Sequence, residues 1–338
     1  ATGPLICSTL GEELNWHYGF AAAGVGKVLG LIQFKLTAKQ LGNSGLSPVA
    51  HTKGETISPE AHPKHWLAVW AGVGAIAILV GMGLTGAIKF DPITLARSST
   101  TLILGLATAY FGYMFFFAGL TTDEKKRTFV ILILFLAAAV FWSGFEQAGS
   151  TLNLFAERYT DRSIGSFTVP AGWYQSLNAV FIIVFAPVFA AVWVSLARRN
   201  LDPSIPVKFG LGLIILASGF AVMIFAAHLV TDGGKAGPMW LVMTYLLHTY
   251  GELCLSPVGL SSVTKLSPKR FVGQMMGIWF LAASLGNLIA GLLAGRFSAD
   301  RVEEMPDLYL QIVLTTAGAG LLLLAFSKPI RKMIGKVH

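Results

Sequence analysis

Acidic side chains inside apolar segments are the residues of this sequence best suited to chemistry. Glu146 ends a run that carries no charge from Thr128 onward, and Glu252 lies in the middle of another apolar segment. An ionisable group in hydrocarbon is costly, so such groups usually face a cavity and act on ions or ligands there. Each acid could instead stay buried and protonated, because a low dielectric disfavours the charged form. Two acids on separate segments fit a carrier in which they exchange protons or pair with a cationic ligand group.

His248 stands four residues before Glu252, which places both side chains on one face of a helix. The two residues could ligate a metal, but no third ligand lies nearby in the sequence, so a zinc site is not indicated. We interpret them as a hydrogen-bonded pair in the core and predict no metal site. The sequence contains neither His-Glu-x-x-His nor Gly-x-Gly-Asp, and we predict no catalytic residue and no enzyme.

Further polar and aromatic side chains could line a wet cavity beside the acids. Gln175 and Asn178 lie at the start of one apolar segment, Ser284 lies in another, and Trp142 and Trp279 lie away from segment ends. Any one of these polar groups is more often a hydrogen bond between helices. Taken together, the set predicts a cavity with aromatic walls.

The composition predicts an all-α polytopic membrane protein. Hydrophobic residues make up 54% of the chain and charged residues 12%, whereas soluble proteins carry roughly 25% charged residues. About 20 apolar residues cross a bilayer as a helix. We expect spans at about 18–38, 65–88, 98–121, 127–154, 172–197, 207–230, 238–263, 271–296 and 307–327, after the end of a further helix at 1–10. Cys7 and Cys254 give no disulfide framework.

The positive charge lies in alternate loops, which indicates membrane topology and excludes nucleic-acid binding as its explanation. One set of loops contains Lys35, Lys39, Lys53, Lys64, Lys125, Lys126, Arg127, Arg198, Arg199, Lys208, Lys265, Lys269, Arg270, Lys328, Arg331, Lys332 and Lys336. The opposite set contains only Lys89, Arg97, Arg158, Arg162, Lys235, Arg296 and Arg301. The positive-inside rule places the first set, and the C-terminus, in the cytoplasm. Lys27 is left within a span, where a long stem can snorkel to the interface.

Small residues at helical spacing predict close packing of helices in lipid. They include Gly26-x-x-x-Gly30, Gly291-x-x-x-Gly295 and the group Gly81, Gly83 and Gly86. Pro187 and Pro257 lie within expected spans, where each removes a helix hydrogen bond and can kink the helix.

Four stretches together resemble the proton-dependent oligopeptide transporters, a branch of the major facilitator superfamily. They are Asn15-Trp16-His17-Tyr18-Gly19-Phe20, Phe145-Glu146-Gln147, Trp173-Tyr174-Gln175-Ser176-Leu177-Asn178 and Gly251-Glu252-Leu253-Cys254-Leu255-Ser256-Pro257-Val258-Gly259-Leu260. The resemblance covers nearly the whole chain. It implies a major facilitator fold with an incomplete N-terminal bundle at 1–40, a linker with two extra transmembrane helices at 41–126, and a C-terminal six-helix bundle at 127–338.

The resemblance also implies a role for each matching residue. Glu252 would meet the amine of a peptide with the help of Asn178, and Glu146 would couple transport to proton movement. The remaining expected substrate-binding residues are Trp142, Trp279, Ser256, Gln175 and Ser284. The implied protein imports di- and tripeptides with protons through the bacterial inner membrane. Its partners are small peptides and the lipid bilayer, with no cofactor beyond protons and no obligate protein partner.

The chain departs from the family pattern at its start. The first-helix motif Glu-x-x-Glu-Arg-Phe and the fourth-helix lysine do not occur, and we expect that an N-terminal part is absent and that residues 1–338 alone do not transport. A carrier of the same fold for nitrate or a drug-like solute remains the alternative. A channel is a further alternative, although single acids on different spans fit alternating access better than rings of charge.

Overall fold

The computed structural model describes residues 2–41, 50–52, 55–57, 63–86, 88, 91–295 and 302–335. Lys53, Lys89, Arg296, Arg301 and Lys336, which enter the expected charge asymmetry, lie outside these residues. The chain divides into two compact units, one formed by residues 1–20 and 96–338 and the other by residues 21–95.

The smaller unit contains most of helix α2 (Trp16–Thr37), the short helix η2 (Ala38–Leu41), the strand pair β1 (Ala50–Thr52) and β2 (Glu55–Ile57), and helix α3 (Pro63–Leu84). The strands are antiparallel. Helices α2 and α3 correspond to the expected spans at 18–38 and 65–88. Lys27 is exposed on α2.

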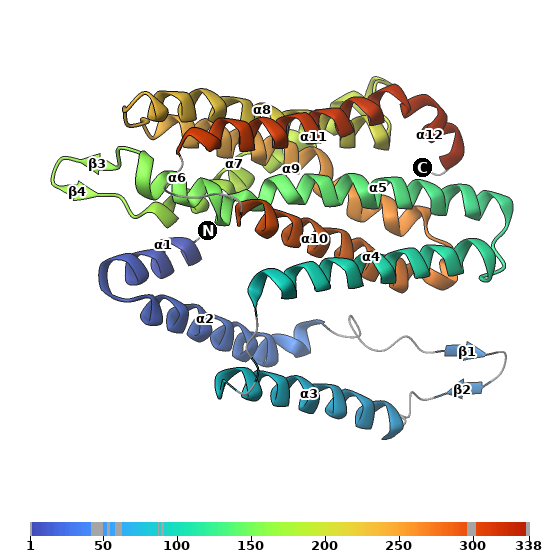
Figure 1. Ribbon diagram of the computed structural model, residues 1–338. Helices are drawn as coiled ribbons and strands as arrows, with labels where there is room; N and C mark the ends of the chain where they lie inside the picture. The colour runs from blue at the N-terminus through green and yellow to red at the C-terminus, as the bar shows by residue number, and fades with distance from the viewer. Residues whose placement is uncertain are drawn as a thin grey trace. The chain divides into compact units, whose positions relative to one another are not determined.

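The larger unit is built almost entirely from helices (Figure 1). They are α1 (Thr2–Thr9), η1 (Leu10–Leu14), α4 (Pro92–Phe116), α5 (Thr122–Phe145), η3 (Glu146–Gly149), α6 (Thr151–Tyr159), η4 (Ala171–Gln175), α7 (Ser176–Arg198), α8 (Ile205–Thr231), α9 (Met239–Leu266), η5 (Lys269–Phe271), α10 (Val272–Ala294), η6 (Val302–Glu304), α11 (Met305–Ala325) and α12 (Ser327–Ile334). The strands β3 (Ser163–Ile164) and β4 (Phe167–Thr168) form a short antiparallel hairpin between α6 and η4.

The helical membrane class is confirmed. Within the described residues, seven helices are long and apolar enough to cross a bilayer. A helix can pair most of its backbone polar groups within itself, which is what a lipid environment requires.

Helix α5 shows how the sequence sets the start of a span. Gly119 has a positive φ of 61°, which lets the chain turn out of α4. Thr121 then caps α5 through its hydroxyl, which accepts a hydrogen bond of 3.3 Å from the backbone N–H of Glu124. The Glu124 carboxylate accepts in return from the Thr121 N–H at 2.9 Å. This capping box satisfies backbone donors that the first turn leaves free.

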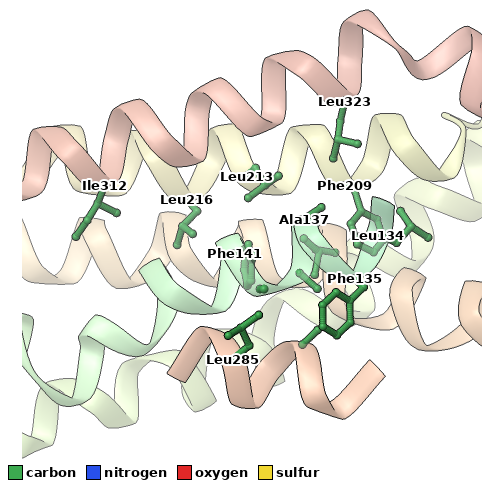
Figure 2. Close-up of a cluster of buried hydrophobic side chains, with 14 of the residues drawn as sticks. Leu134, Phe135, Ala137, Phe141, Phe209, Leu213, Leu216, Leu285, Ile312 and Leu323 are labelled. Carbon is green, nitrogen blue, oxygen red and sulfur yellow. The ribbon is translucent and has the colours of Figure 1, made fainter. Parts of the chain in front are cut away.

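The core of the larger unit lies between α5, α8, α10 and α11. Phe141 and Leu216 are fully buried there, and Leu285 and Ile312 are nearly so (Figure 2). Helices of this unit approach closely where glycines face one another. A Cβ at Gly212 would lie 2.9 Å from the carbonyl oxygen of Gly251.

The glycines at which helices approach closely are not those of the Gly-x-x-x-Gly motifs in the sequence. A Cβ at Gly210 would lie 2.9 Å from the carbonyl oxygen of Gly320, so this pair joins α8 to α11. Within the described residues of the larger unit, no other element comes within 4 Å of the Cβ position at Gly291.

Several features differ from the expected spans. Helices α3 and α9, at the expected spans 65–88 and 238–263, are not among the seven helices of the described residues that are long and apolar enough to cross a bilayer. The span at 127–154 is interrupted, because α5 ends at Phe145 and a short 3₁₀ segment precedes α6. Helix α12 follows α11 with only Phe326 between them, and it was not expected from the sequence (Figure 1). Pro187 and Pro257 lie inside the assigned helices α7 and α9.

Candidate functional site

Glu252 and Asn178 meet between α9 and α7. The Asn178 side-chain amide donates a hydrogen bond of 2.9 Å to Oε2 of Glu252 and another of 3.1 Å to Oγ1 of Thr249. The Thr249 hydroxyl donates to the carbonyl oxygen of Tyr245 at 2.7 Å. Thr249 therefore fixes Asn178, and Asn178 fixes one oxygen of the Glu252 carboxylate.

Glu146 lies at the break between α5 and α6. The break is held by Gln147, whose side chain is fully buried. Its amide donates to the carbonyl oxygen of Ala290 in α10 at 3.2 Å, and its Oε1 accepts from Oγ1 of Thr151 at 2.9 Å. The neighbouring Glu146 is half-buried. Phe145, the residue before it, packs against His248, which stands one turn before Glu252, with ring centroids 6.3 Å apart. The fold thus brings the two acids of the sequence analysis into one region.

Gln175 ends η4, immediately before α7. Its side-chain amide donates a hydrogen bond of 3.1 Å to Oδ1 of Asn153 in α6. Gln175 therefore connects the α6 segment to the start of the helix that carries Asn178.

The two tryptophans lie on different helices. Trp142 in α5 packs edge-on against Phe145, with ring centroids 5.2 Å apart. Trp279 in α10 is buried and packs against Phe209 at 6.1 Å. A Cβ at Gly259 would lie 2.3 Å from the Trp279 ring, so that glycine makes room for it.

Among the described residues, the two serines of the expected site form no hydrogen bond with Glu146 or Glu252. Ser256 is half-buried in α9, one turn after Glu252. The Ser284 hydroxyl is exposed and donates to the carbonyl oxygen of Phe280 in its own helix at 3.1 Å. Within the described residues, no group of three or more His, Cys, Asp and Glu side chains could hold a metal ion.

The expected hydrogen bond between His248 and Glu252 is wrong. His248 is 1% exposed, and neither ring nitrogen has a hydrogen-bond partner among the described residues. Its ring lies 4.7 Å from that of Phe220, and a Cβ at Gly219 would lie 2.5 Å from it. The imidazole packs against α8, where Gly219 leaves space for it.

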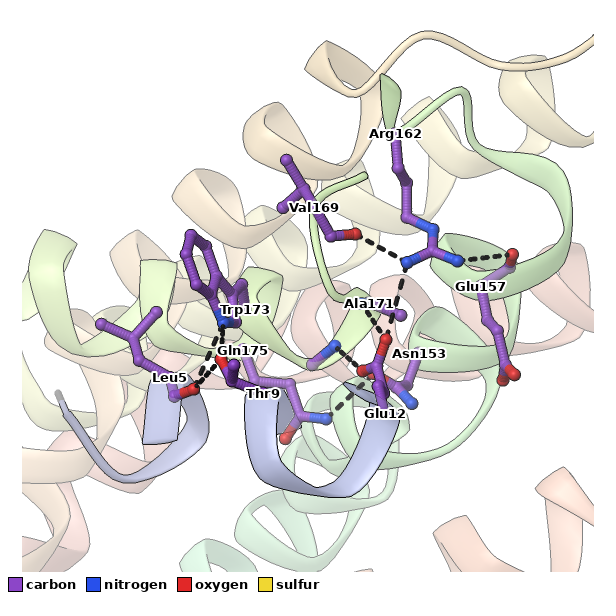
Figure 3. Close-up of polar contacts among 11 residues, drawn as sticks. Leu5, Thr9, Glu12, Asn153, Glu157, Arg162, Val169, Ala171, Trp173 and Gln175 are labelled. Atoms are coloured by element: carbon purple, nitrogen blue, oxygen red, sulfur yellow. Dashed lines mark hydrogen bonds and ion pairs between the residues drawn. The ribbon is translucent and has the colours of Figure 1, made fainter. Parts of the chain in front are cut away.

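A polar junction that the sequence analysis did not find joins the N-terminal segment to η4 (Figure 3). The Glu12 carboxylate in η1 accepts from the backbone N–H of Ala171 at 2.8 Å and of Gly172 at 3.0 Å. Arg162 lies 3.6 Å from the same carboxylate and donates to the carbonyl oxygen of Val169 at 2.6 Å. The partners of Glu12 lie 159 and 160 residues away in the chain, so no local pattern marks them.

Close packing and a second hydrogen bond reinforce this junction. The indole N–H of Trp173 donates to Oγ1 of Thr9 at 2.9 Å. A Cβ at Gly172 would lie only 1.9 Å from Oγ of Ser8, so α1 and η4 are in direct contact.

Comparisons with known proteins agree with this arrangement. The sequence profile of the POT family matches residues 2–307. Peptide transporter YePEPT of Yersinia enterocolitica is 38% identical over 340 residues, which cover 99% of this chain and 66% of that protein. A di-/tripeptide transporter of Lactococcus lactis subsp. cremoris is 30% identical over 349 residues, with the same two coverages.

Solved structures of POT transporters are also similar to this chain. A crystal structure of peptide transporter POT in complex with sulfate superposes with a TM-score of 0.81 at 33% identity, and the match covers 98% of this chain and 65% of that one. A crystal structure of a POT family transporter in complex with 5-aminolevulinic acid has a TM-score of 0.76 at 27% identity. The chain spans about two thirds of the length of the relatives it matches: 66% of YePEPT.

Proposed function

Because this chain belongs to the POT family, we propose that the whole protein imports di- and tripeptides together with protons by alternating access. Relatives that match the chain over nearly its full length are named as peptide transporters. The chain has the helical membrane fold of transporters and not of an enzyme.

The observation that carries this proposal is the way Glu252 is held. Asn178 orients one carboxylate oxygen, and no cation pairs with the acid among the described residues. An acid that is oriented but not neutralised can bind the ammonium group of a peptide, and a charge-assisted hydrogen bond is stronger than a neutral one. We propose that Trp142, Trp279, Ser256, Gln175 and Ser284 complete the surroundings of the peptide.

Glu146 is proposed to couple proton movement to transport. It lies at a helix break, and its side chain has no hydrogen-bond or ion-pair partner among the described residues. A positive peptide amine beside Glu252 would favour the charged form of a nearby carboxylate, and loss of the amine would favour its protonated form. Proton uptake at the pair would therefore depend on whether the substrate is bound.

The junction around Glu12 is proposed to close one end of the transport path. Residues 1–40 are expected to end one bundle and residues 127–338 to form the other, so the hydrogen bonds from Glu12 to Ala171 and Gly172 would join the two. Alternating access requires such contacts to form at one end and break at the other. The charge asymmetry puts Arg158 and Arg162 outside the cytoplasm and the C-terminus inside, and this orientation is part of the proposal.

Uptake into proteoliposomes tests the proposed function. We expect the gene product that carries this chain to accumulate a labelled dipeptide in response to an inward proton gradient, and to do so saturably. Labelled nitrate serves as the competing solute, because an anion would need a cationic partner that the region around Glu252 does not supply within the described residues. Nitrate uptake without dipeptide uptake would contradict the proposal.

A further inference from the structure

A basic cavity lies at one end of the larger unit, between α8, α9 and α12. Its volume is about 560 Å³, which is within the range of small-molecule pockets. Lys208, Lys265 and Arg331 line it, together with the carboxylate of Asp202 and the hydroxyl groups of Ser204 and Ser261. None of these residues belongs to the site around Glu252.

The cavity carries more positive charge than its own acid neutralises. Lys208 pairs with Asp202 at 2.8 Å, and its ammonium also lies 4.8 Å from the centre of the Trp193 ring. Lys265 and Arg331 form no ion pair or hydrogen bond among the described residues. Two cations that share one cavity without a counter-charge repel each other, and an anion between them would remove that cost.

The cations of the cavity lie at the ends of long helices, where the charge asymmetry would place the headgroups of a bilayer. Lys208 is in the first turn of α8 and Lys265 in the last turn of α9, so both mark the same end of spanning helices. Helix α12 has the pattern of an interfacial helix, because Ile330 and Ile334 are buried while Arg331 is exposed. The lining also includes apolar side chains such as Val258, which suits a ligand with both charged and apolar parts.

We propose that this cavity binds the phosphate group of an anionic phospholipid, with Lys265 and Arg331 as its cationic contacts. Basic pockets between transmembrane helices bind anionic lipid headgroups in this way. The inference does not depend on the transported substrate, since it uses only the fold and the charges at the end of the bundle.

Lipid binding to the purified gene product in neutral detergent tests the proposal, by native mass spectrometry and by thermal unfolding. The probes are phosphatidylglycerol, the zwitterionic phosphatidylethanolamine and inorganic phosphate, each added separately. We expect phosphatidylglycerol to bind most tightly and to raise Tm. The double variant K265Q/R331Q should lose about 100-fold in affinity for it, since each hydrogen bond from a cationic side chain to the phosphate contributes about tenfold or more.

The matched control is K269Q/K332Q. It removes the same charge at the same end of the bundle, from residues that do not line the cavity. The control should bind phosphatidylglycerol as the unmodified protein does, and unchanged Tm values without lipid would show that both double variants fold. Equal binding of the two lipids, an equal loss in the control, or a Tm increase with inorganic phosphate alone that matches the lipid would overturn the proposal.

Discussion

The side-chain amide of Asn178 donates a hydrogen bond of 2.9 Å to Oε2 of Glu252, and this bond joins α7 to α9. The neutral amide of Asn178 therefore orients the Glu252 carboxylate without neutralising its charge. A substitution that removes the charge of Glu252 but keeps an acceptor can therefore test the charge separately from the hydrogen bond.

Glu252→Gln should weaken dipeptide binding by about 30-fold or more, because loss of one partner of a buried charge pair costs about 2–5 kcal/mol. Its amide oxygen can still accept from Asn178, so the fold should persist. Competition binding with a labelled dipeptide measures the effect. Glu157→Gln, at an exposed acid, is the control. Unchanged affinity in Glu252→Gln would refute the amine contact.

Glu146→Gln should reduce proton-driven uptake more than counterflow exchange, because only net uptake requires net proton transfer. The half-buried side chain of Glu146, at the break between α5 and α6, forms no hydrogen bond or ion pair in the described part of the chain. Parallel uptake and counterflow assays on the same proteoliposomes measure the ratio. An equal loss in both assays would indicate a role in binding or folding instead.

Glu12→Gln should lower the free energy of unfolding by roughly 1.5–3 kcal/mol, the usual contribution of hydrogen bonds to a charged group. Its carboxylate accepts from two backbone N–H groups and lies near Arg162. Denaturant or thermal unfolding in detergent measures the change. Glu13→Gln is the matched control, since the adjacent acid is exposed and makes no such contact among the described residues. Equal effects of the two substitutions would argue against the junction.

Gly172→Ala should force α1 and η4 apart, because the added Cβ would lie 1.9 Å from Oγ of Ser8. We expect a lower Tm and, if the junction closes one end of the path, a changed transport rate. The second-site change Ser8→Gly removes the clashing atoms and should restore both. Gly237→Ala is the control, since its Cβ would meet open space. Failure of Ser8→Gly to rescue would contradict the contact.

His248→Leu should leave stability unchanged or raise it. Both ring nitrogens are buried without a partner among the described residues, and a buried unsatisfied polar group costs about 1–3 kcal/mol. Leucine has a similar volume and would fill the space beside Phe220. Thermal unfolding measures the difference, with His248→Ala as the cavity-forming comparison. A marked loss of stability in His248→Leu would mean that the imidazole has a polar partner after all.

The sequence alone determined the class of the protein and the position of most helices. Apolar runs of spanning length can only be helices in lipid, because each must satisfy its own backbone hydrogen bonds. Glu146 and Glu252 could also be identified as candidate functional residues. Placing a carboxylate within an apolar span costs free energy, so such residues usually have a function. Both inferences depend only on the hydropathy and the charges within a single segment of the sequence.

The tertiary structure decided which residues meet. The break after Phe145 is held by a hydrogen bond from Gln147 to Ala290, which lies 143 residues away in the sequence. Gly210 packs on Gly320, whereas Gly291 has open space despite its place in a Gly-x-x-x-Gly motif. Spacing shows that a helix can be approached closely, but not which helix approaches it. His248 shares a helix face with Glu252 yet turns toward Gly219, because the space there was created by another helix. The same holds for Glu12, whose backbone partners lie in η4, 159 and 160 residues away in the chain, so only the folded protein brings them together.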